Sequence, residues 1–274
     1  MSVSRGRRAA PWGRIALLGT CMAALGLVTA RGLGAAVPEA AFWLLLVAIV
    51  GLVGLGVFFL PSGMFGRPLL GGDGSRPLVA ITFDDGPDPE ATREIMKLLE
   101  EGGHRGTFFV IGERALAQSE LVREIAERGH ALGNHSYFHS YLTPFRSARR
   151  LAAELDEAGA VMAAAAGIRP RWFRPPVGLL SPPVAEAACR AGLEVVGWTS
   201  TARDGWASTT VEAAVARLER GLRPGAILVL HDAVERGARA PIAPAVLRRL
   251  LGLLEARGLR SVTLDELLEA PPAG

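Results

Sequence analysis

The stretch Ile81-Thr82-Phe83-Asp84-Asp85-Gly86-Pro87 decides the fold class of this chain of 274 residues. An apolar run ends on two adjacent carboxylates and a Gly-Pro turn follows, so both acids are expected at the C-terminal tip of a buried strand. Parallel α/β enzymes keep their chemistry at such tips. Adjacent strand residues point to opposite faces, but the bend into the turn can bring Asp84 and Asp85 into one pocket. The alternative is that Asp-Asp-Gly-Pro is simply a turn.

Two histidines, His135 and His139, provide the second signal. Side chains four residues apart meet on one face of a helical turn, a spacing that suits two imidazoles on one metal ion with Asp85 or Asp84 as the oxygen ligand. Two histidines and one carboxylate leave a coordination position open for water, as in catalytic zinc sites. The competing interpretation is a pair of capping or surface histidines. We favour the metal site because the pair follows a predicted strand end in a chain with only five histidines.

Three further segments, 171–178, 195–206 and 227–232, repeat the order of apolar strand and polar tip. A single such segment is ordinary, but five in succession fit ordinary turns poorly. In order, the tips read T-F-D-D-G-P, H-S-Y-F-H, R-P-P-V-G, D-G-W and L-V-L-H. Together they resemble the polysaccharide deacetylase family, carbohydrate esterase family 4, with its NodB homology region. The resemblance runs from about Pro77 to about Leu268.

The resemblance implies a metal centre with a base beside it. Asp84 would be the general base, and Asp85, His135 and His139 would hold a divalent metal. Zinc is the metal expected from a His-His-Asp set, with cobalt or manganese as alternatives. Such a metal lowers the pKa of a bound water and polarises the amide carbonyl.

The same resemblance assigns the surrounding residues. His231 would protonate the leaving amine, and Asp204 would hydrogen-bond His231 and raise its pKa. Arg174 would pair with Asp84 and keep it ionised. Trp206 and Leu228 would wall the pocket for the acetyl methyl group.

Two motifs depart from the family pattern. Val177 stands where the family often has tyrosine, so its backbone N–H remains available to the oxyanion but a ring contact to sugar is lost. Thr201 replaces the first acid of the usual D-x-x-D-W motif, and Gly205 separates Asp204 from Trp206. These departures affect substrate fit more than the reaction.

Other polar residues receive structural interpretations. His130 is expected to be a buried structural or supporting histidine, and His104 to lie in an exposed turn after two glycines. Asp232 either orients His231 or satisfies backbone donors, and we favour the second.

Strands are predicted over 78–83, 107–111, 131–134, 172–174, 194–199, 226–230 and 261–264, with helices between them. Asp88-Pro89-Glu90 and Ser181-Pro182 are helix starts, and Thr209-Thr210-Val211-Glu212 is a capping box. This alternation predicts a parallel sheet, and short buried strands with reactive tips favour a closed barrel. The expected fold is therefore the family's deformed (β/α) barrel of seven or eight strands, preceded by one or two N-terminal transmembrane helices. The catalytic domain is expected over 77–270.

The N-terminus contains two apolar runs, 15–30 and 41–60, within an anchor region over 15–60. A basic tail over 1–14 precedes them, and a Gly- and Pro-rich linker over 61–76 follows. A signal peptide is the alternative for the first run. We favour a hairpin of two spans, which by the positive-inside rule puts the tail and the catalytic domain on the cytoplasmic side of a membrane, in bacteria the inner membrane. If the first run does not span, the domain faces outward.

The formal net charge of +3 is small and is largely explained by the basic tail beside a membrane, so no nucleic-acid partner is implied. The two cysteines, Cys21 and Cys189, form no disulfide framework. The expected partners are the bilayer and an N-acylated glycan or lipid-linked amino sugar. Three functions follow: a deacetylase of N-acetylglucosamine-containing glycans, a deformylase or deacylase of a polyprenyl-phosphate-linked amino sugar, or an inactive glycan-binding membrane protein.

Overall fold

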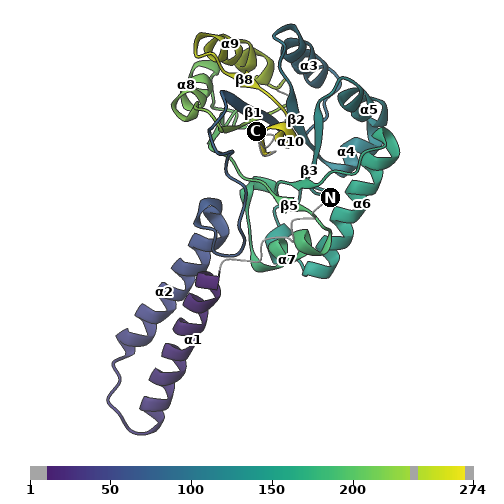
Figure 1. Ribbon diagram of the computed structural model, residues 1–274. Coiled ribbons are helices and arrows are strands. Elements are labelled where there is room, and N and C mark those ends of the chain that lie inside the picture. Colours follow the sequence, from purple (N-terminus) through teal and green to yellow (C-terminus); the bar gives the residue numbers. More distant parts are fainter. Residues whose placement is uncertain (1–10, 235–239, 269–274) are drawn as a thin grey trace.

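Eight parallel strands form the centre of the molecule in the computed structural model, which describes residues 11–234 and 240–268 (Figure 1). Among these residues the strands are β1 (Leu78–Asp84), β2 (Gly106–Val110), β3 (Ala131–Asn134), β4 (Trp172–Phe173), β5 (Glu194–Val195), β6 (Ser200–Thr201), β7 (Ile227–His231) and β8 (Arg260–Ser261). Their order is β5-β4-β3-β2-β1-β7-β6, and β8 pairs with the start of β1. The sheet curls into an incomplete barrel, so the expected deformed (β/α) barrel is confirmed.

The gap between the first and last strands of this order is bridged by part of the segment predicted to be a linker. The backbone N–H of Leu69 donates to Val195 in β5 at 2.9 Å, and that of Gly72 donates to Gly225 just before β7 at 2.8 Å. Open sheet edges leave backbone groups without partners, and this Gly- and Pro-rich stretch satisfies some of them. The segment 61–76 is therefore packed on the barrel rather than free.

Helices surround the sheet (Figure 1). They are α3 (Ala91–Glu101), α4 (Gly112–Ala117), α5 (Ser119–Glu127), α6 (Ala148–Ala166), α7 (Pro182–Arg190), α8 (Val211–Gly221), α9 (Ala243–Ala256) and α10 (Leu264–Leu268), with 3-10 turns η1 (Leu60–Ser62), η2 (Thr143–Phe145) and η3 (Pro176–Gly178). Alternation along β1 places Ile81 and Phe83 in the core beneath these helices, whereas Ala80 packs in the cluster that fills the inside of the barrel. The inward face of β1 ends at Asp84.

Most predicted elements are present, with shifted ends. Of the strand expected over 194–199 only Glu194 and Val195 form a strand, β5; Val196 pairs with Leu69 of the bridging segment, and β6 begins beyond the predicted range at Ser200. The last predicted strand is only two residues long and leads into α10. Helix α8 is capped by the hydroxyl of Thr210, which accepts from Ala213 N–H at 3.2 Å, so the cap lies one residue after the predicted box at Thr209.

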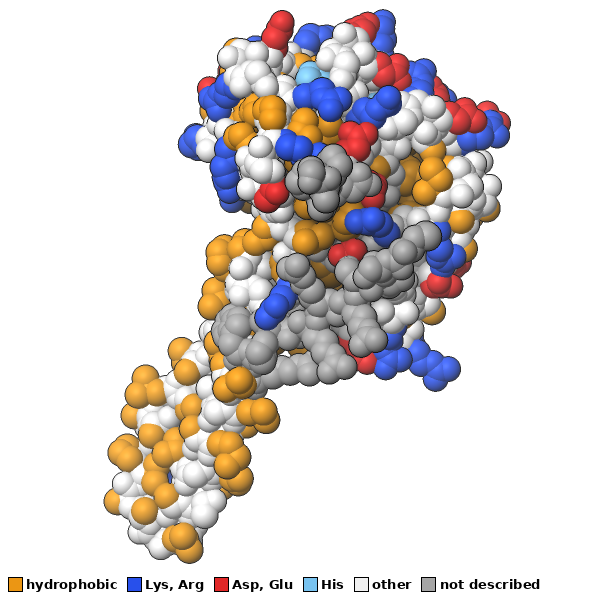
Figure 2. All heavy atoms as spheres, viewed as in Figure 1, with side chains coloured by type: hydrophobic (Ala, Val, Ile, Leu, Met, Phe, Trp, Pro, Cys, Tyr) orange, Lys and Arg blue, Asp and Glu red, His pale blue; other side chains and the backbone are white. Residues whose placement is uncertain are grey.

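Two long apolar helices, α1 (Pro11–Gly32) and α2 (Glu39–Phe58), form an antiparallel hairpin that projects from the barrel (Figure 1). The spans long and apolar enough to cross a bilayer are Ile15–Gly32 and Glu39–Phe58, and they are 0% and 6% buried. Apolar side chains cover the hairpin, whereas charged ones gather on the barrel domain (Figure 2). The tail arginines Arg5, Arg7 and Arg8 lie outside the described residues.

Candidate metal centre and active site

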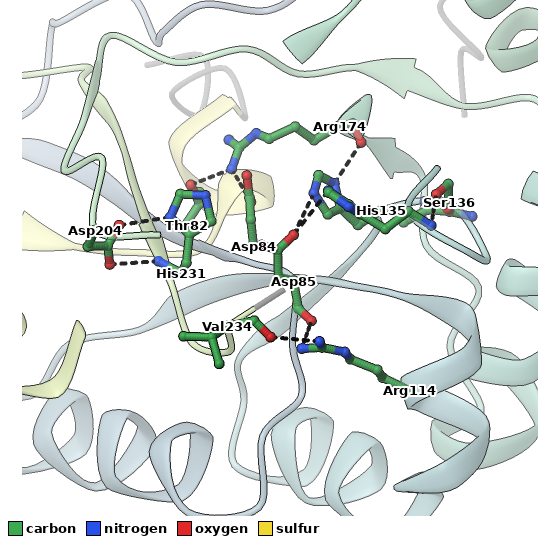
Figure 3. Close-up of polar contacts among 12 residues, drawn as sticks. Thr82, Asp84, Asp85, Arg114, His135, Ser136, Arg174, Asp204, His231 and Val234 are labelled. Atoms are coloured by element: carbon green, nitrogen blue, oxygen red, sulfur yellow. Dashed lines mark hydrogen bonds and ion pairs between the residues drawn. The ribbon is translucent and has the colours of Figure 1, made fainter. Parts of the chain in front are cut away.

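The tip of β1 directs both of its carboxylates toward the same site (Figure 3). Asp84 ends the strand opposite His231 of β7, and Asp85 has a φ of 72°. This left-handed conformation is uncommon for a residue with a side chain, although Asp tolerates it better than most. It interrupts the strand alternation, so two adjacent acids serve one pocket, as the turn after Asp85 suggested.

Asp85, His135 and His139 converge at this tip. Asp85 Oδ1 lies 3.2 Å from the Nε2 atoms of both His135 and His139, and the three side chains are between 3% and 9% exposed. One ligand atom from each of them lies within 4.8 Å of the other two. The three predicted ligands therefore form one compact, buried cluster.

The donor set fits a divalent cation. Nδ1 of His135 lies 2.8 Å from the carbonyl of Arg174; a carbonyl can only accept, so Nδ1 carries the proton and Nε2 can offer its lone pair toward Asp85. Asp85 Oδ1 is buried and has no hydrogen-bond partner. Burial would raise the pKa of Asp85, but the three neighbouring histidines, His135, His231 and His139, favour its ionised form and lower the pKa well below its usual range. A carboxylate facing imidazole nitrogens needs a cation between them, as a metal ion would provide.

The loop that carries the two histidines is held by residues that the sequence analysis did not select. The Ser136 hydroxyl accepts from His139 N–H at 3.0 Å. Glu154, 6% exposed on α6, accepts from the N–H groups of Tyr137 and Phe138 and pairs with Arg146 at 2.5 Å. Glu154 lies in a helical stretch rich in alanine, and sequence spacing does not distinguish it from the exposed acids beside it.

A second supporting residue is Arg114 on α4. Its guanidinium donates to the carbonyls of Asp85 and Val234, each at 2.8 Å, and so ties the tip of β1 to the segment after β7 (Figure 3). In the sequence Arg114 is one of many arginines, and no motif selects it.

Arg174 and Asp84 form a buried ion pair. Arg174 is fully buried, and its Nη1 lies 2.6 Å from Asp84 Oδ1 and 2.8 Å from the hydroxyl of Thr82. Its Nη2 donates to the carbonyl of Gly197 at 3.0 Å, and its guanidinium lies 4.1 Å from the centre of the Phe109 ring. These contacts of Nη1 and Nη2 fix the direction of the Asp84 carboxylate, whereas Nε of Arg174 is buried without a hydrogen-bond partner.

Asp204 and His231 form the second polar pair. Asp204 Oδ1 lies 2.8 Å from His231 Nδ1, and its Oδ2 accepts from His231 N–H at 2.9 Å. Burial alone would lower the pKa of His231, but the hydrogen bond and charge of Asp204, with the charges of Asp84 and Asp85, raise it to about 9. The imidazole therefore holds its proton at neutral pH, as an acid must before it donates.

The three predicted substrate contacts are placed differently. Val177 is 56% exposed in η3 with a φ of 57°, a strained conformation for a β-branched residue. Trp206 is 64% exposed, with Arg203 over its ring at 5.6 Å. Leu228 is fully buried in the core beneath the helices, and strand alternation puts it on the face opposite His231. Its side chain therefore cannot wall the pocket as expected, and Val229 occupies the inward face instead.

The remaining polar residues are mainly structural. His130 is 4% exposed and accepts from Gly106 N–H at 3.2 Å, and burial with nearby arginines lowers its pKa to about 4. His104, expected in an exposed turn, is half-buried and accepts from Ser261 N–H. Asp232 was expected to satisfy backbone donors; its side chain accepts from its own backbone N–H and also from the Thr92 hydroxyl at 2.5 Å.

The chain is similar to several known proteins. A family model described as polysaccharide deacetylase matches residues 71–196. A peptidoglycan-N-acetylglucosamine deacetylase of Bacillus cereus is 35% identical over 193 residues, which cover 70% of this chain and 88% of the relative. A chitooligosaccharide deacetylase of a Bradyrhizobium species is 34% identical over 170 residues, covering 62% and 77%. A family 4 acetyl xylan esterase of Clostridium thermocellum, solved with a cobalt ion, has a TM-score of 0.63 and 34% identity, covering 69% and 89%.

The fold and site define a barrel hydrolase that acts on carbon–nitrogen bonds other than peptide bonds. The chain belongs to the polysaccharide deacetylase family, carbohydrate esterase family 4. The predicted family is thereby confirmed.

Proposed function

We propose that this protein removes the acetyl group from N-acetylglucosamine units of a glycan by metal-dependent hydrolysis. The observation that carries the proposal is the convergence of three buried metal-type ligands, Asp85, His135 and His139, between a carboxylate and a protonated imidazole. The relatives named above, which act on peptidoglycan and chitooligosaccharide, support the substrate class.

Asp84 and His231 divide the proton transfers. Asp84, oriented by Arg174, accepts a proton from the water that attacks the acetyl carbon. The C–N bond then breaks, and His231 gives its Nε2 proton to the leaving amine while Asp204 holds the opposite nitrogen. A metal held by the Asp85 cluster would supply Lewis-acid polarisation of the carbonyl and a lower water pKa. Zinc is the proposed ion, and cobalt or manganese suits the same donors.

The rim of the site is proposed to shape substrate binding. Val177 lies in η3 with a left-handed backbone, and its N–H is proposed to donate to the developing oxyanion. Trp206 offers an exposed aromatic surface to the sugar or acetyl group.

The apolar hairpin is proposed to anchor the enzyme in the bacterial inner membrane. Close contacts of Met64 with both Gly13 and Gly56 bring the start of α1 and the end of α2 together beside the barrel. The N-terminal tail and the catalytic domain would then lie on the same side of the membrane. The basic residues near these helix ends favour the cytoplasmic side. Fusion of reporters that are active only inside or only outside the cell to the C-terminus tests this; activity of the outside reporter would refute the cytoplasmic assignment.

The anchor also supports a second candidate, a deacylase or deformylase of an amino sugar linked to a polyprenyl phosphate. A hairpin with both apolar helices exposed restricts the enzyme to substrates at the bilayer. Rates on soluble chitooligosaccharide and on polyprenyl-linked sugar in nanodiscs separate the two. A glycan-binding protein without activity would release amine from neither.

The roles are tested with the purified full chain by metal analysis and amine release. His139→Ala is expected to lose the metal and nearly all turnover, because it removes one of three ligands. His231→Ala is expected to keep the metal and lose rate. Activity that survives both Asp84→Asn and chelation would refute the proposed site, and loss of metal from His231→Ala would refute the separation of roles.

A further inference from the structure

The turn η2, which follows the candidate metal loop, presents apolar side chains to the outside. Leu142 is 66% exposed and Phe145 is 83% exposed. The turn itself is firmly held, since Thr143 and Pro144 are buried, and the Pro144 carbonyl accepts from the Ser181 hydroxyl at 2.9 Å. A well-held backbone that exposes large apolar groups is typical of a binding surface.

This turn lies beside the end of α2. The backbone N–H of Leu180 donates to the carbonyl of Val57 at 3.1 Å, and the next residue, Ser181, makes the bond to Pro144. With 20 residues, α2 is about 30 Å long, the thickness of a bilayer hydrocarbon core, so Val57 at its end would lie at the headgroup layer. The adjacent η2 would lie at the same depth. Phe58 and Phe59 continue the apolar surface and are 73% and 52% exposed.

Positive charge surrounds the apolar surface. Arg149 and Arg150 are exposed in the first turn of α6, directly after η2. Cations there oppose the helix dipole, so they do not serve the stability of the helix. Arg67, also exposed, follows the Phe65 that packs on Gly56 of α2. Arginines flanking exposed apolar residues match the chemistry of an anionic phospholipid surface.

We infer that Leu142 and Phe145, with Arg149 and Arg150, form a docking turn that inserts into the headgroup layer of an anionic bilayer beside the hairpin. The inference rests on the proposed membrane anchor. His139 precedes this turn closely, and its ring lies 6.1 Å from that of Tyr141. Docking would hold the metal loop near the bilayer surface, which favours an amino sugar carried on a lipid as the substrate.

Fluorescence quenching tests the docking turn in the full chain, reconstituted in nanodiscs of anionic phospholipid that carry nitroxide at the headgroup or along the acyl chain. One environment-sensitive thiol dye is placed at Phe145→Cys or at Lys97→Cys, with Cys21 and Cys189 replaced by serine. Lys97 is an exposed control on α3, which Figure 1 shows at the end of the domain away from the hairpin. A third sample keeps Cys21 as the labelled residue, because it lies inside the first proposed span.

The dye at position 145 is expected to lose about half of its fluorescence with headgroup nitroxide, and the dye at position 97 less than about a tenth. Arg149→Gln with Arg150→Gln should reduce the quenching at position 145. If the dye at position 145 is not quenched while the dye on Cys21 is quenched by acyl-chain nitroxide, the docking turn is refuted and the membrane anchor is retained. Cys21 unquenched would remove the anchor and this inference with it. Neither result depends on catalysis, so a failure here is distinct from a failure of the proposed reaction.

Discussion

Replacing Asp204 by asparagine removes the charge that keeps His231 protonated. The substitution keeps one carbonyl oxygen that can accept from His231 Nδ1, and it places an NH2 group where Asp204 Oδ2 accepts from His231 N–H. It therefore removes the negative charge, which acts through the pKa of His231, and one backbone hydrogen bond, whose loss does not depend on pH. Burial lowers the pKa of His231, and Asp204 is the leading opposing influence. The pKa is therefore expected to fall from about 9 to about 6.5 or below.

The size of the effect follows from the protonated fraction. At pH 8, a histidine with a pKa of about 9 is about nine-tenths protonated, and one with a pKa of about 6.5 is about three-hundredths protonated, a loss of about 30-fold in the acid form. At pH 5.5 the first is almost fully protonated and the second about nine-tenths protonated, so the difference in protonation then contributes almost nothing to the ratio of rates. The raised pKa thus keeps His231 protonated at high pH, and the Asp204→Asn variant should lose activity chiefly at high pH.

The assay is kcat/KM for amine release from chitooligosaccharide between pH 5.5 and 9, on metal-loaded protein. Asp156→Asn, an exposed carboxylate on α6, is the matched control and should follow the parent at every pH. A ratio of parent to Asp204→Asn that stays constant across this range would refute the reasoning, because Asp204 would then act only by positioning.

Two further substitutions test the packing around the site. Gly133→Ala would place its Cβ 2.5 Å from the Phe109 ring that supports Arg174, and it should lower the free energy of unfolding by about 1–3 kcal/mol and reduce turnover. The control Gly252→Ala, which meets open space on α9, should instead raise the free energy of unfolding by about 0.5–1 kcal/mol. Equal effects of the two substitutions in denaturant unfolding would contradict this prediction. Glu154→Ala should weaken metal affinity about 10- to 100-fold in chelator competition, because the histidine loop loses its buried acceptor. Exposed Glu157→Ala on the same helix should leave the affinity unchanged, and a matching loss there would count against the role of Glu154.

Sequence reasoning reached the residues whose chemistry is local. The order of apolar strand and polar tip located Asp84, Asp85 and His231, and the four-residue spacing selected His135 and His139. The two histidines meet in a loop, however, and not on the helical turn that the spacing assumed. Each of these signals depends on a few neighbouring residues, which is why they could be found without a structure.

It failed where a residue's position depends on a distant segment. Leu228 lies close to the active site in the sequence, yet alternation along β7 turns it into the core. Gly and Pro content indicated a linker, but Leu69 bonds to strand β5 and Gly72 to the residue Gly225 just before β7, each more than one hundred residues later in the chain.

The sequence by itself determined the barrel, the family and the chemical types of the reactive residues, because strand periodicity, turn composition and motif spacing are short-range properties of the chain. Only the tertiary structure decided which polar groups support them, as with Glu154 and Arg114, and that the turn η2 lies beside the end of α2. These contacts form when separate segments pack around a common core. A buried polar group needs a hydrogen-bond partner, and the fold decides which groups lie close enough to provide one.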